Sequence, residues 1–490
     1  MSGSPPVASR PQLLTYPDSL GGSLGAIAEL LDGPLDGLFH GVHVLPPFPS
    51  SADRGFAPLT YDEIDPRFGS WDDIARISRR HDVLLDLMVN HISRQSPQFQ
   101  DFLRRGRRSP YADLFITLDK IWPGGVPDPA DVARIFLRKP DDPFSTVLIA
   151  ETEQPERIWT SFGSADWSEQ IDLDVTSGAT RALITDWLRS FAARGVRIVR
   201  LDAVGYVIKK PGTSCFMVEP EIYDFLAWVT DVAASFGLAV LPEVHDVQAT
   251  HEHLSEHGFW TYDFVLPGLL LETFTSGDPV RLAAHLHRSP DRQFTTLDCH
   301  DGIPVRPDLD GILEPSEMTA LADRVRQGGG NVNRILSVHP DGVDVHQLNA
   351  TYYSALDCDD DRYVAARAIQ LFARGVPQVY YVGLLAGEND LGAVARTGDG
   401  RAINRHDYPM AEVLEALGRP VVARIVELIK LRNVHPAFEG TMWVEAPRPR
   451  TIAMRWTNPG ADLTLEVDFG AGRARLVDAD STRDIACWEP

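Results

Sequence analysis

Short runs of apolar and β-branched residues recur along the chain, and segments in which apolar residues follow a helical spacing separate them. Such a run predicts a buried strand, whereas apolar residues spaced by three and four positions predict a helix. Eight strands alternate with helices in this way, which predicts a parallel (β/α)8 or TIM barrel. The predicted strands are residues 13–16, 38–44, 83–91, 196–202, 238–245, 262–266, 293–302 and 376–381. The predicted helices are residues 25–31, 71–81, 181–194, 222–236, 363–373 and 421–432.

Two long irregular segments interrupt this alternation, and a different pattern ends the chain. Residues 92–175 follow the third strand and residues 302–358 follow the seventh. We expect both to be inserted subdomains, because loops of this length are uncommon within a compact barrel. Apolar and polar residues alternate within residues 436–490, which predicts a small antiparallel β domain. The barrel itself then comprises residues 1–91, 176–301 and 359–435.

Acidic residues stand at the carboxyl ends of several predicted strands. Asp202, Glu243 and Asp301 end the fourth, fifth and seventh strands. In a (β/α)8 barrel the active site lies at this end of the strands, so we expect the three carboxylates to converge. Arg200 and Asp202 are two residues apart and face the same way, which would also fit a purely structural ion pair. Three like charges in one place would be poor design for stability alone and therefore favour a catalytic role.

Composition narrows the class of partner. The chain has 490 residues, and 69 acidic against 46 basic residues give a formal charge of −23. This charge disfavours nucleic acids and anionic membranes and favours a soluble protein with a small-molecule partner, although it also serves plain solubility. The absence of an apolar run of about 18 residues predicts no membrane span. The scattered cysteines, Cys215, Cys299, Cys358 and Cys487, predict reduced thiols in a cytoplasmic protein.

Paired carboxylates at one site suit the cleavage of glycosidic bonds through an oxocarbenium-like transition state. One carboxylate attacks or stabilises the cationic centre, and the other stays protonated until it donates to the leaving oxygen. The separation of the two groups decides between retention and inversion, and the sequence leaves both open.

Four motifs carry a resemblance to a known family. Arg-Leu-Asp-Ala-Val-Gly-Tyr at 200–206, Asp-Leu-Met-Val-Asn-His at 86–91, Glu-Val-His at 243–245 and His-Asp-Gly at 300–302 resemble the strand-end motifs of the α-amylase superfamily, glycoside hydrolase family 13. Further stretches resemble the sucrose phosphorylase group within it. These stretches are residues 213–217, 349–356, 376–383 and 403–406.

The resemblance implies a retaining double displacement. Asp202 would be the nucleophile that forms a β-glucosyl-enzyme, Glu243 the general acid and then base, and Asp301 the stabiliser of the transition state. Inorganic phosphate would take the place of water and yield α-glucose 1-phosphate, and no cofactor or metal is implied. The residues expected to hold the glucosyl unit are Asp53, Phe56, His91, Gln170, Arg200, Tyr206, His300 and Arg405.

The acceptor loops depart from the pattern that sucrose phosphorylases usually carry. Phe-Leu-Arg-Lys-Pro at 136–140 replaces Tyr-Arg-Pro-Arg-Pro, and Val-Asp-Val-His-Gln at 343–347 replaces Leu-Asp-Leu-Tyr-Gln. A proline has become Arg138 and a tyrosine has become His346, and both new side chains suit a phosphate monoester. The expected acceptor and phosphate site comprises Arg138, Lys139, His245, Asp344, His346 and Gln347.

The favoured hypothesis is therefore phosphorolysis of sucrose 6′-phosphate, and of sucrose as well, to α-glucose 1-phosphate and fructose 6-phosphate or fructose. This pattern resembles the sucrose 6-phosphate phosphorylase branch, and the resemblance also suggests a homodimer. One alternative is a sucrose phosphorylase in which Arg138 and Lys139 are solvated surface charges and His346 merely replaces a tyrosine in binding inorganic phosphate. Another is that glucosylglycerol or glucosylglycerate is the donor. Two further hypotheses lie outside the phosphorylases: the protein is an α-glucoside hydrolase, or it is a non-catalytic binding protein.

Overall fold

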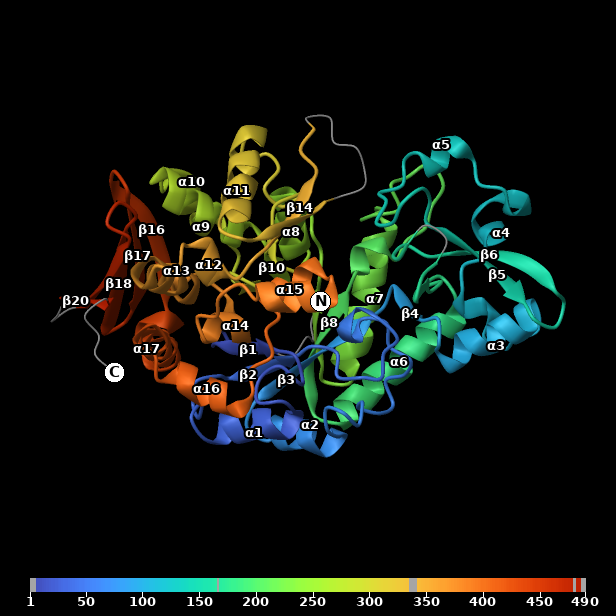
Figure 1. Ribbon diagram of the computed structural model, residues 1–490, viewed down its shortest axis with the longest axis horizontal. Helices are drawn as coiled ribbons and strands as arrows, with labels where there is room; N and C mark the ends of the chain where they lie inside the picture. Colours follow the sequence, from blue (N-terminus) through green and yellow to red (C-terminus); the bar gives the residue numbers. More distant parts are fainter. Residues whose placement is uncertain (1–5, 165–166, 335–341, 479–481, 486–490) are drawn as a thin grey trace. The chain divides into compact units, whose positions relative to one another are not determined.

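The computed structural model describes residues 6–164, 167–334, 342–478 and 482–485 (Figure 1). Eight parallel strands form a nearly closed barrel, which confirms the predicted TIM-barrel fold. Their order in the sheet is β10-β11-β15-β1-β2-β3-β8-β9. The bounds are β1 Gln12–Thr15, β2 Gly41–Val44, β3 Asp82–Met88, β8 Val196–Asp202, β9 Ala239–Pro242, β10 Thr261–Asp263, β11 Gln293–Thr295 and β15 Val376–Tyr380.

The helices between these strands include all six predicted ones. The fifth, sixth and seventh predicted strands are too long, because β9 ends at Pro242, β10 at Asp263 and β11 at Thr295. After β10 a helix begins at Val265. Nearly all residues of that helix are buried, so its apolar run lacks the polar face that marks a helix in a sequence. The helices outside the two long segments are α1 Leu24–Asp32, α2 Trp71–Ser78, α6 Gly178–Ala193, α7 Glu221–Ser235, α8 Gln248–Glu256, α9 Val265–Ser276, α10 Val280–Arg288, α13 Asp360–Phe372, α14 Tyr381–Leu384, α15 Leu391–Thr397, α16 Met410–Leu417 and α17 Pro420–Val434.

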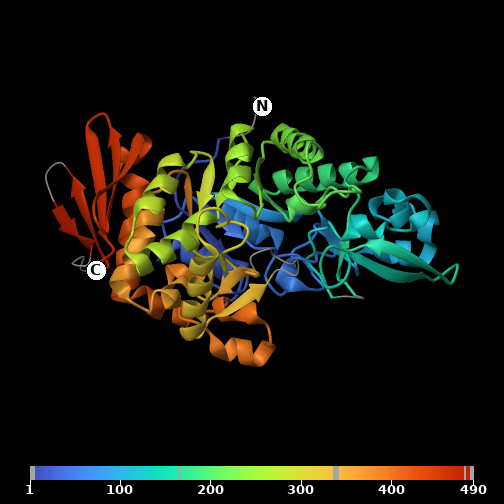
Figure 2. The ribbon, with the colours of Figure 1, turned by 90° about the horizontal axis from the view of Figure 1, so that it is seen from above.

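The chain comprises two compact units. Among the described residues, 6–7 and 44–244 belong to the first, and 8–43, 245–334 and the part after 341 belong to the second. In the first unit, residues 92–175 build antiparallel pairs of strands, β4 with β7 and β5 with β6, and the β5–β6 ribbon stands out in Figure 2. A separate hydrophobic cluster around Trp122, Phe144 and Trp159 lies in this segment. The bounds are β4 His91–Ser93, α3 Pro97–Arg105, α4 Leu118–Ile121, α5 Pro129–Val132, β5 Phe144–Ile149, β6 Gln154–Trp159 and β7 Gln170–Asp172.

In the second unit, the segment 302–358 is more regular than predicted. It contains a 13-residue helix, whose buried residues Met318, Leu321, Ala322 and Val325 follow a helical spacing, and an antiparallel sheet in the order β12-β14-β13. The prediction that this segment is irregular is therefore wrong. The buried positions of the helix are spaced by three and four residues, which is the spacing of an amphipathic helix. The bounds are β12 Ile303–Pro304, α11 Pro315–Gln327, β13 Asn331–Arg334, β14 Val345–Asn349 and α12 Tyr352–Ala355.

The second unit also carries the predicted antiparallel β sheet near the C-terminus, and the structure confirms it. Trp456 on this sheet donates its indole N–H to the carbonyl oxygen of Phe372 at the end of α13, at 2.7 Å. A buried indole with a satisfied N–H is a strong anchor between a sheet and a helix. The strands are β16 Thr441–Arg448, β17 Thr451–Asn458, β18 Ala461–Asp468, β19 Arg473–Asp478 and β20 Thr482–Asp484.

A substitution at Gly375, just before β15, tests how closely the chain at this point approaches β11. It has φ +90°, and an added Cβ would lie 2.2 Å from the carbonyl oxygen of Gln293. Gly398 has a similar φ of +70° but nothing within 4 Å of such a Cβ, so it is the matched control. A side chain at positive φ costs about 1–2 kcal/mol, and overpacking adds about 1–3 kcal/mol. We therefore expect Gly375→Ala to lower Tm clearly more than Gly398→Ala in differential scanning calorimetry; equal losses would contradict the close approach.

Candidate active site

A buried ionic cluster lies at the carboxyl ends of β3, β8 and β9 in the first unit. Parallel pairing places Asp86 opposite Arg200 and Met88 opposite Asp202, so both acidic residues fall at the strand ends. The Arg200 guanidinium contacts the Asp86 carboxylate, lies 3.1 Å from Asp202 Oδ1 and lies 2.5 Å from Glu243 Oε1. The structure thus brings two predicted catalytic residues together on one guanidinium.

This cluster is costly to bury. Arg200 is only 3% exposed and Asp86 is fully buried. Desolvated charges stabilise a fold only when each has a well-placed partner. Because one guanidinium serves three carboxylates, the cluster is formally negative when all are ionised. Fixed negative charge of this kind stabilises a cation that develops during a reaction.

The backbone after Asp202 completes the cluster. The amide N–H of Ala203 donates to Glu243 Oε2 at 3.0 Å, so both oxygens of that carboxylate have a donor. Ala203 adopts φ 51°, in the left-handed region that disfavours residues with a Cβ. Strain of this kind concentrates at functional sites, where the surrounding structure holds it in place.

The predicted glucosyl-site residues of the first unit gather around one carbonyl group. His91 Nε2 lies 2.9 Å from the carbonyl oxygen of Phe56, and Gln170 Nε2 donates to the same oxygen at 3.0 Å. Burial lowers the pKa of His91, so its imidazole is neutral, and the carbonyl partner requires the proton on Nε2. The Arg200 guanidinium lies 5.8 Å above the Phe56 ring. Asp53, at the start of the short helix Asp53–Gly55 just before Phe56, has φ 50°.

An aromatic cluster in the same unit receives Arg138. The Cζ atom of its guanidinium lies 5.9 Å from the ring centroid of Phe162 and 6.0 Å from the ring centroid of Tyr206. Tyr206 also packs at 4.8 Å against Phe216, and Phe162 packs at 5.5 Å against His91. Phe162 and Phe216 were missed as site residues, because single aromatic residues in irregular segments carry no spacing signal. Arg138 is therefore half-buried against rings and is not a freely solvated surface charge.

Lys139 has a structural environment. It is fully buried, and its ammonium donates to the Phe144 carbonyl at 2.7 Å and the Thr160 hydroxyl at 2.8 Å. Three neutral oxygens, including Ser145 Oγ at 3.3 Å, surround this charge inside the 92–175 segment. We infer that Lys139 holds the loop that carries Arg138 and leave it out of the proposed acceptor site, which departs from the sequence-based expectation.

In the second unit, Asp301 lies among cationic side chains. Its Oδ1 is 3.2 Å from Arg401 and 3.6 Å from Arg405, and its Oδ2 is 3.4 Å from His300 Nε2. Arg405 also donates through Nε to the carbonyl oxygen of His300 at 2.7 Å. The structure therefore groups three predicted residues and adds Arg401, which the sequence analysis missed.

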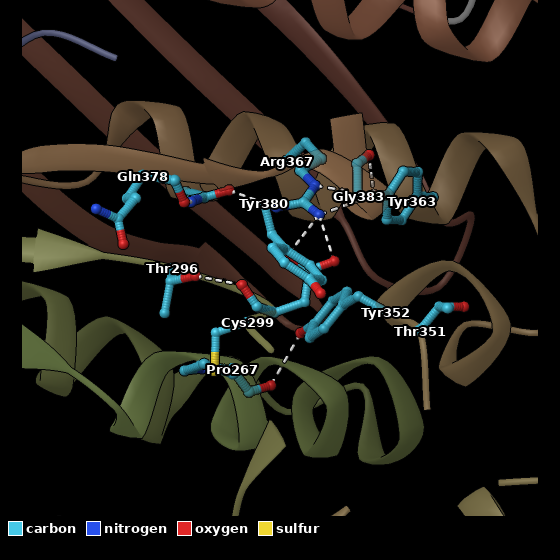
Figure 3. A network of polar contacts seen from close by, with 12 residues as sticks. Pro267, Thr296, Cys299, Thr351, Tyr352, Tyr363, Arg367, Gln378, Tyr380 and Gly383 are labelled. Carbon is cyan, nitrogen blue, oxygen red and sulfur yellow. Dashed lines mark hydrogen bonds and ion pairs between the residues drawn. The ribbon is translucent and has the colours of Figure 1, made fainter. Parts of the chain in front are cut away.

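The backbone that leads to Asp301 is held at successive residues. The carbonyl oxygens of Asp298, Cys299 and His300 each accept a hydrogen bond from a side chain. The Asp298 carboxylate in turn accepts from the fully buried Arg367, at 2.7 and 2.8 Å (Figure 3). Because the donor side chains are themselves buried, these hydrogen bonds restrict the backbone on which Asp301 stands. The three donors are Thr296, Asn404 and Arg405.

The predicted acceptor residues of the second unit occupy different environments. His346 lies in β14 and is 4% exposed, and its ring meets the ring of His245 edge-on at 5.8 Å. Gln347 is buried opposite Pro304. Asp344 is partly exposed and pairs with Arg334 at 2.7 Å. The structure thus brings His245 and His346 together and places Asp344 in an ion pair of its own.

Cys299, His300 and Asp301 form a group that could be considered for a metal ion, because one donor atom from each lies within 4.8 Å of the others. Two guanidinium groups adjoin the Asp301 carboxylate, however, and Cys299 Sγ lies 3.5 Å from the Gly302 carbonyl oxygen. Nearby cations oppose the binding of a further cation. These surroundings suit an anion or sugar hydroxyl groups better than a metal.

Comparisons with known proteins agree with this fold. The family description "Alpha amylase, catalytic domain" matches residues 19–258. The chain is 52% identical to a sucrose 6(F)-phosphate phosphorylase of Thermoanaerobacterium thermosaccharolyticum over 94% of each chain. It is 42% identical to a sucrose phosphorylase of Streptococcus mutans, over 97% of this chain and 99% of that one. A crystal structure of sucrose 6F-phosphate phosphorylase from Thermoanaerobacter thermosaccharolyticum superposes with a TM-score of 0.95, with 49% identity and 98% of each chain covered.

This chain accordingly belongs to the α-amylase family, within the group of its sucrose and sucrose-phosphate phosphorylases. Among the described residues, no helix is both long and apolar enough to cross a membrane. Cys487, one of the four predicted reduced thiols, lies outside the described residues, and within the described residues Cys215, Cys299 and Cys358 are not joined in disulfide bonds.

Asp86 tests the buried cluster without removing a predicted catalytic group. Asp86→Asn removes the one carboxylate of the cluster that is not assigned to the reaction and frees the Arg200 guanidinium to shift. Losing one charge-assisted hydrogen bond costs about 1.5–3 kcal/mol, so we expect kcat/KM to fall about 10–100-fold. The measurement is steady-state release of glucose 1-phosphate.

Asp82→Asn is the matched control. Asp82 lies at the other end of β3 and pairs with Arg197 of β8 at 3.8 Å, where both side chains are partly exposed. We expect its kcat/KM to stay within about twofold of the wild type, because exposed ion pairs contribute little. A comparable loss in both variants would show that Asp86 acts only through general stability.

Proposed function

We propose that this protein is a retaining glycoside phosphorylase that cleaves sucrose 6′-phosphate with inorganic phosphate, giving α-glucose 1-phosphate and fructose 6-phosphate. The observation that carries the proposal is the 52% identity to a sucrose 6(F)-phosphate phosphorylase over nearly the whole chain, against 42% to a sucrose phosphorylase. Sucrose itself is proposed as a second, poorer donor. Cytoplasmic location and a homodimeric assembly stay predictions.

The proposed reaction proceeds by two displacements. The Asp202 carboxylate attacks C1 of the glucosyl unit while Glu243 protonates the departing fructosyl oxygen, so the C1–O bond breaks and a β-glucosyl-enzyme forms. A phosphate oxygen then attacks C1 from the other face while its proton passes to the Glu243 carboxylate, and the bond between C1 and Asp202 breaks. Two inversions at C1 give the α product. Asp301 would stabilise the cationic transition state, and the guanidinium shared by Asp202 and Glu243 supports their assignment as one reacting pair.

The acceptor end of the substrate is where the proposal is most specific. Arg138 and His346 replace residues that are neutral in the sucrose phosphorylase pattern, and we propose that they bind the 6′-phosphate. The environment of Arg138 supports this role, because two aromatic rings restrict its guanidinium and reduce the entropy lost on binding. His346 supplies a ring that is buried and fixed within β14.

The double variant Arg138→Ala, His346→Ala tests this assignment. Two lost charge-assisted hydrogen bonds of about 1.5–3 kcal/mol each predict a KM for sucrose 6′-phosphate that rises about 100-fold or more. The KM for sucrose should change less than about threefold, because sucrose carries no phosphate to lose contact with. Initial rates with both donors at saturating inorganic phosphate measure the two values side by side.

Arg134→Ala is the control within the same loop. Arg134 is exposed, and within the described part of the chain its guanidinium donates to the carbonyl oxygen of Gly212 alone, at 3.3 Å. Both KM values should therefore stay near those of the wild type. Equal increases in the KM for sucrose and in the KM for sucrose 6′-phosphate in the double variant would refute the proposal that Arg138 and His346 bind the 6′-phosphate. Glucose release without phosphate, at the rate seen with phosphate, would instead identify a hydrolase.

A further inference from the structure

A short stretch after β12, Arg306–Asp308, holds both histidines of the proposed acceptor site. The carbonyl oxygen of Arg306 lies 2.6 Å from Nδ1 of His346. A carbonyl oxygen only accepts, so the proton of this contact sits on the Nδ1 of His346. The backbone amides of Val305 and Arg306 also donate to the His346 carbonyl, at 2.9 and 3.2 Å. Pairing between β12 and β14 thus fixes the His346 ring and the direction of its Nε2.

Asp308 does the same for the second histidine. Its Oδ2 lies 3.3 Å from Nδ1 of His245. A carboxylate likewise only accepts, so Nδ1 of His245 also carries a proton. The His245 ring stacks on Phe264 with ring centroids 4.0 Å apart and planes 13° apart. The stack fixes the plane of the ring, and Asp308 fixes its rotation within that plane.

Asp308 itself depends on this contact. It is fully buried, and its other oxygen, Oδ1, lies 3.9 Å from Nε2 of His251 and accepts no hydrogen bond from the residues that the structure describes. His251 Nε2 is 3.1 Å from the carbonyl oxygen of Asp246, which is the shorter of its two contacts. Burial lowers the pKa of His251, so that ring is a poor source of positive charge. A fully buried carboxylate needs a cationic or strongly donating partner, and His245 is the nearest one.

We propose that Asp308 is a positioning residue that sets the His245 ring for acceptor binding, so that inorganic phosphate and fructose 6-phosphate meet Nε2 in a fixed direction. This inference rests on the proposed function. The role of Asp308 adds to the proposed function, because Asp308 is not among the residues that the sequence predicts for the site. One stretch of chain then orients both acceptor histidines, His346 through the Arg306 carbonyl and His245 through the Asp308 carboxylate.

Asp308→Asn is the direct test, since it keeps the shape of the side chain and removes its charge. The KM for inorganic phosphate, at saturating sucrose 6′-phosphate, should rise about tenfold, which is a typical effect of losing the partner that orients a binding histidine. Formation of the glucosyl-enzyme from α-glucosyl fluoride should change less than about twofold, because this donor brings neither a phosphate nor a fructosyl group to His245. The kcat/KM for hydrolysis of α-glucosyl fluoride without phosphate measures this step, since it includes only the steps up to the glucosyl-enzyme.

A double-mutant cycle separates positioning from general stability. If Asp308 acts through His245, then Asp308→Asn should add almost nothing to the KM of His245→Ala. Asp263→Asn is the matched control, because Asp263 is also buried and bound to a histidine, His285, at 2.9 Å. It should lower Tm and leave the KM for phosphate unchanged.

The outcomes separate the two proposals. A wild type that forms no α-glucose 1-phosphate from either donor overturns the proposed function. A wild type that does so, together with an unchanged phosphate KM in Asp308→Asn, overturns only the role of Asp308, as would full additivity with His245→Ala. If Asp308→Asn does not fold, Asp308→Glu keeps the charge but moves it by one methylene group. Its phosphate KM should then rise several-fold, and an unchanged value would likewise refute the role.

Discussion

The guanidinium of Arg200 is the interaction on which the first unit's functional site depends. It binds Asp86, Asp202 and Glu243, which come from three adjacent strands of the barrel. Removing such a charge from water costs several kcal/mol per ion unless its partners are well placed, so the register of β3, β8 and β9 is tied to this contact. The same geometry sets two carboxylates beside each other with fixed hydrogen bonds. The contacts that offset the burial of these charges are therefore the same contacts that place Asp202 and Glu243 side by side.

A similar principle applies in the second unit, where the supporting contacts are neutral as well as ionic. Side chains hold the carbonyl oxygens before Asp301, and the buried Arg367–Asp298 pair supports the strand end that precedes them. Gly383 explains why this pair fits, because a Cβ there would lie 1.8 Å from the Arg367 guanidinium. His346 and His245, the proposed acceptor histidines, are likewise held through Nδ1 by a carbonyl and a carboxylate. Across both units, the groups proposed to meet substrate are held by ion pairs and hydrogen bonds to neighbouring side chains and carbonyl groups.

The sequence predicted the barrel well because parallel strands buried on both faces read as uninterrupted apolar runs. It predicted strand-end carboxylates for the same reason, since a charge after such a run stands out. The sequence did not predict two helices. Most residues of α9 are buried, so it lacks a polar face, and few residues of α11 are buried, so its apolar spacing is sparse. Lys139 looked like a ligand-binding cation, but only the fold shows it enclosed by Phe144, Ser145 and Thr160. Arg401 and Phe162 are isolated residues in irregular segments, which no spacing rule could single out.

The proposed reaction requires that Asp202, held by Arg200, becomes covalently glucosylated. The most direct test is to mix the enzyme with α-glucosyl fluoride without phosphate, quench with acid within the first turnover and map the peptides by mass spectrometry. We predict one glucosyl group on the peptide that contains Asp202, lost when inorganic phosphate is added before the quench, with α-glucose 1-phosphate released in equal amount. A glucosyl group on another residue, or β-glucose 1-phosphate formed without any covalent adduct, would contradict the account.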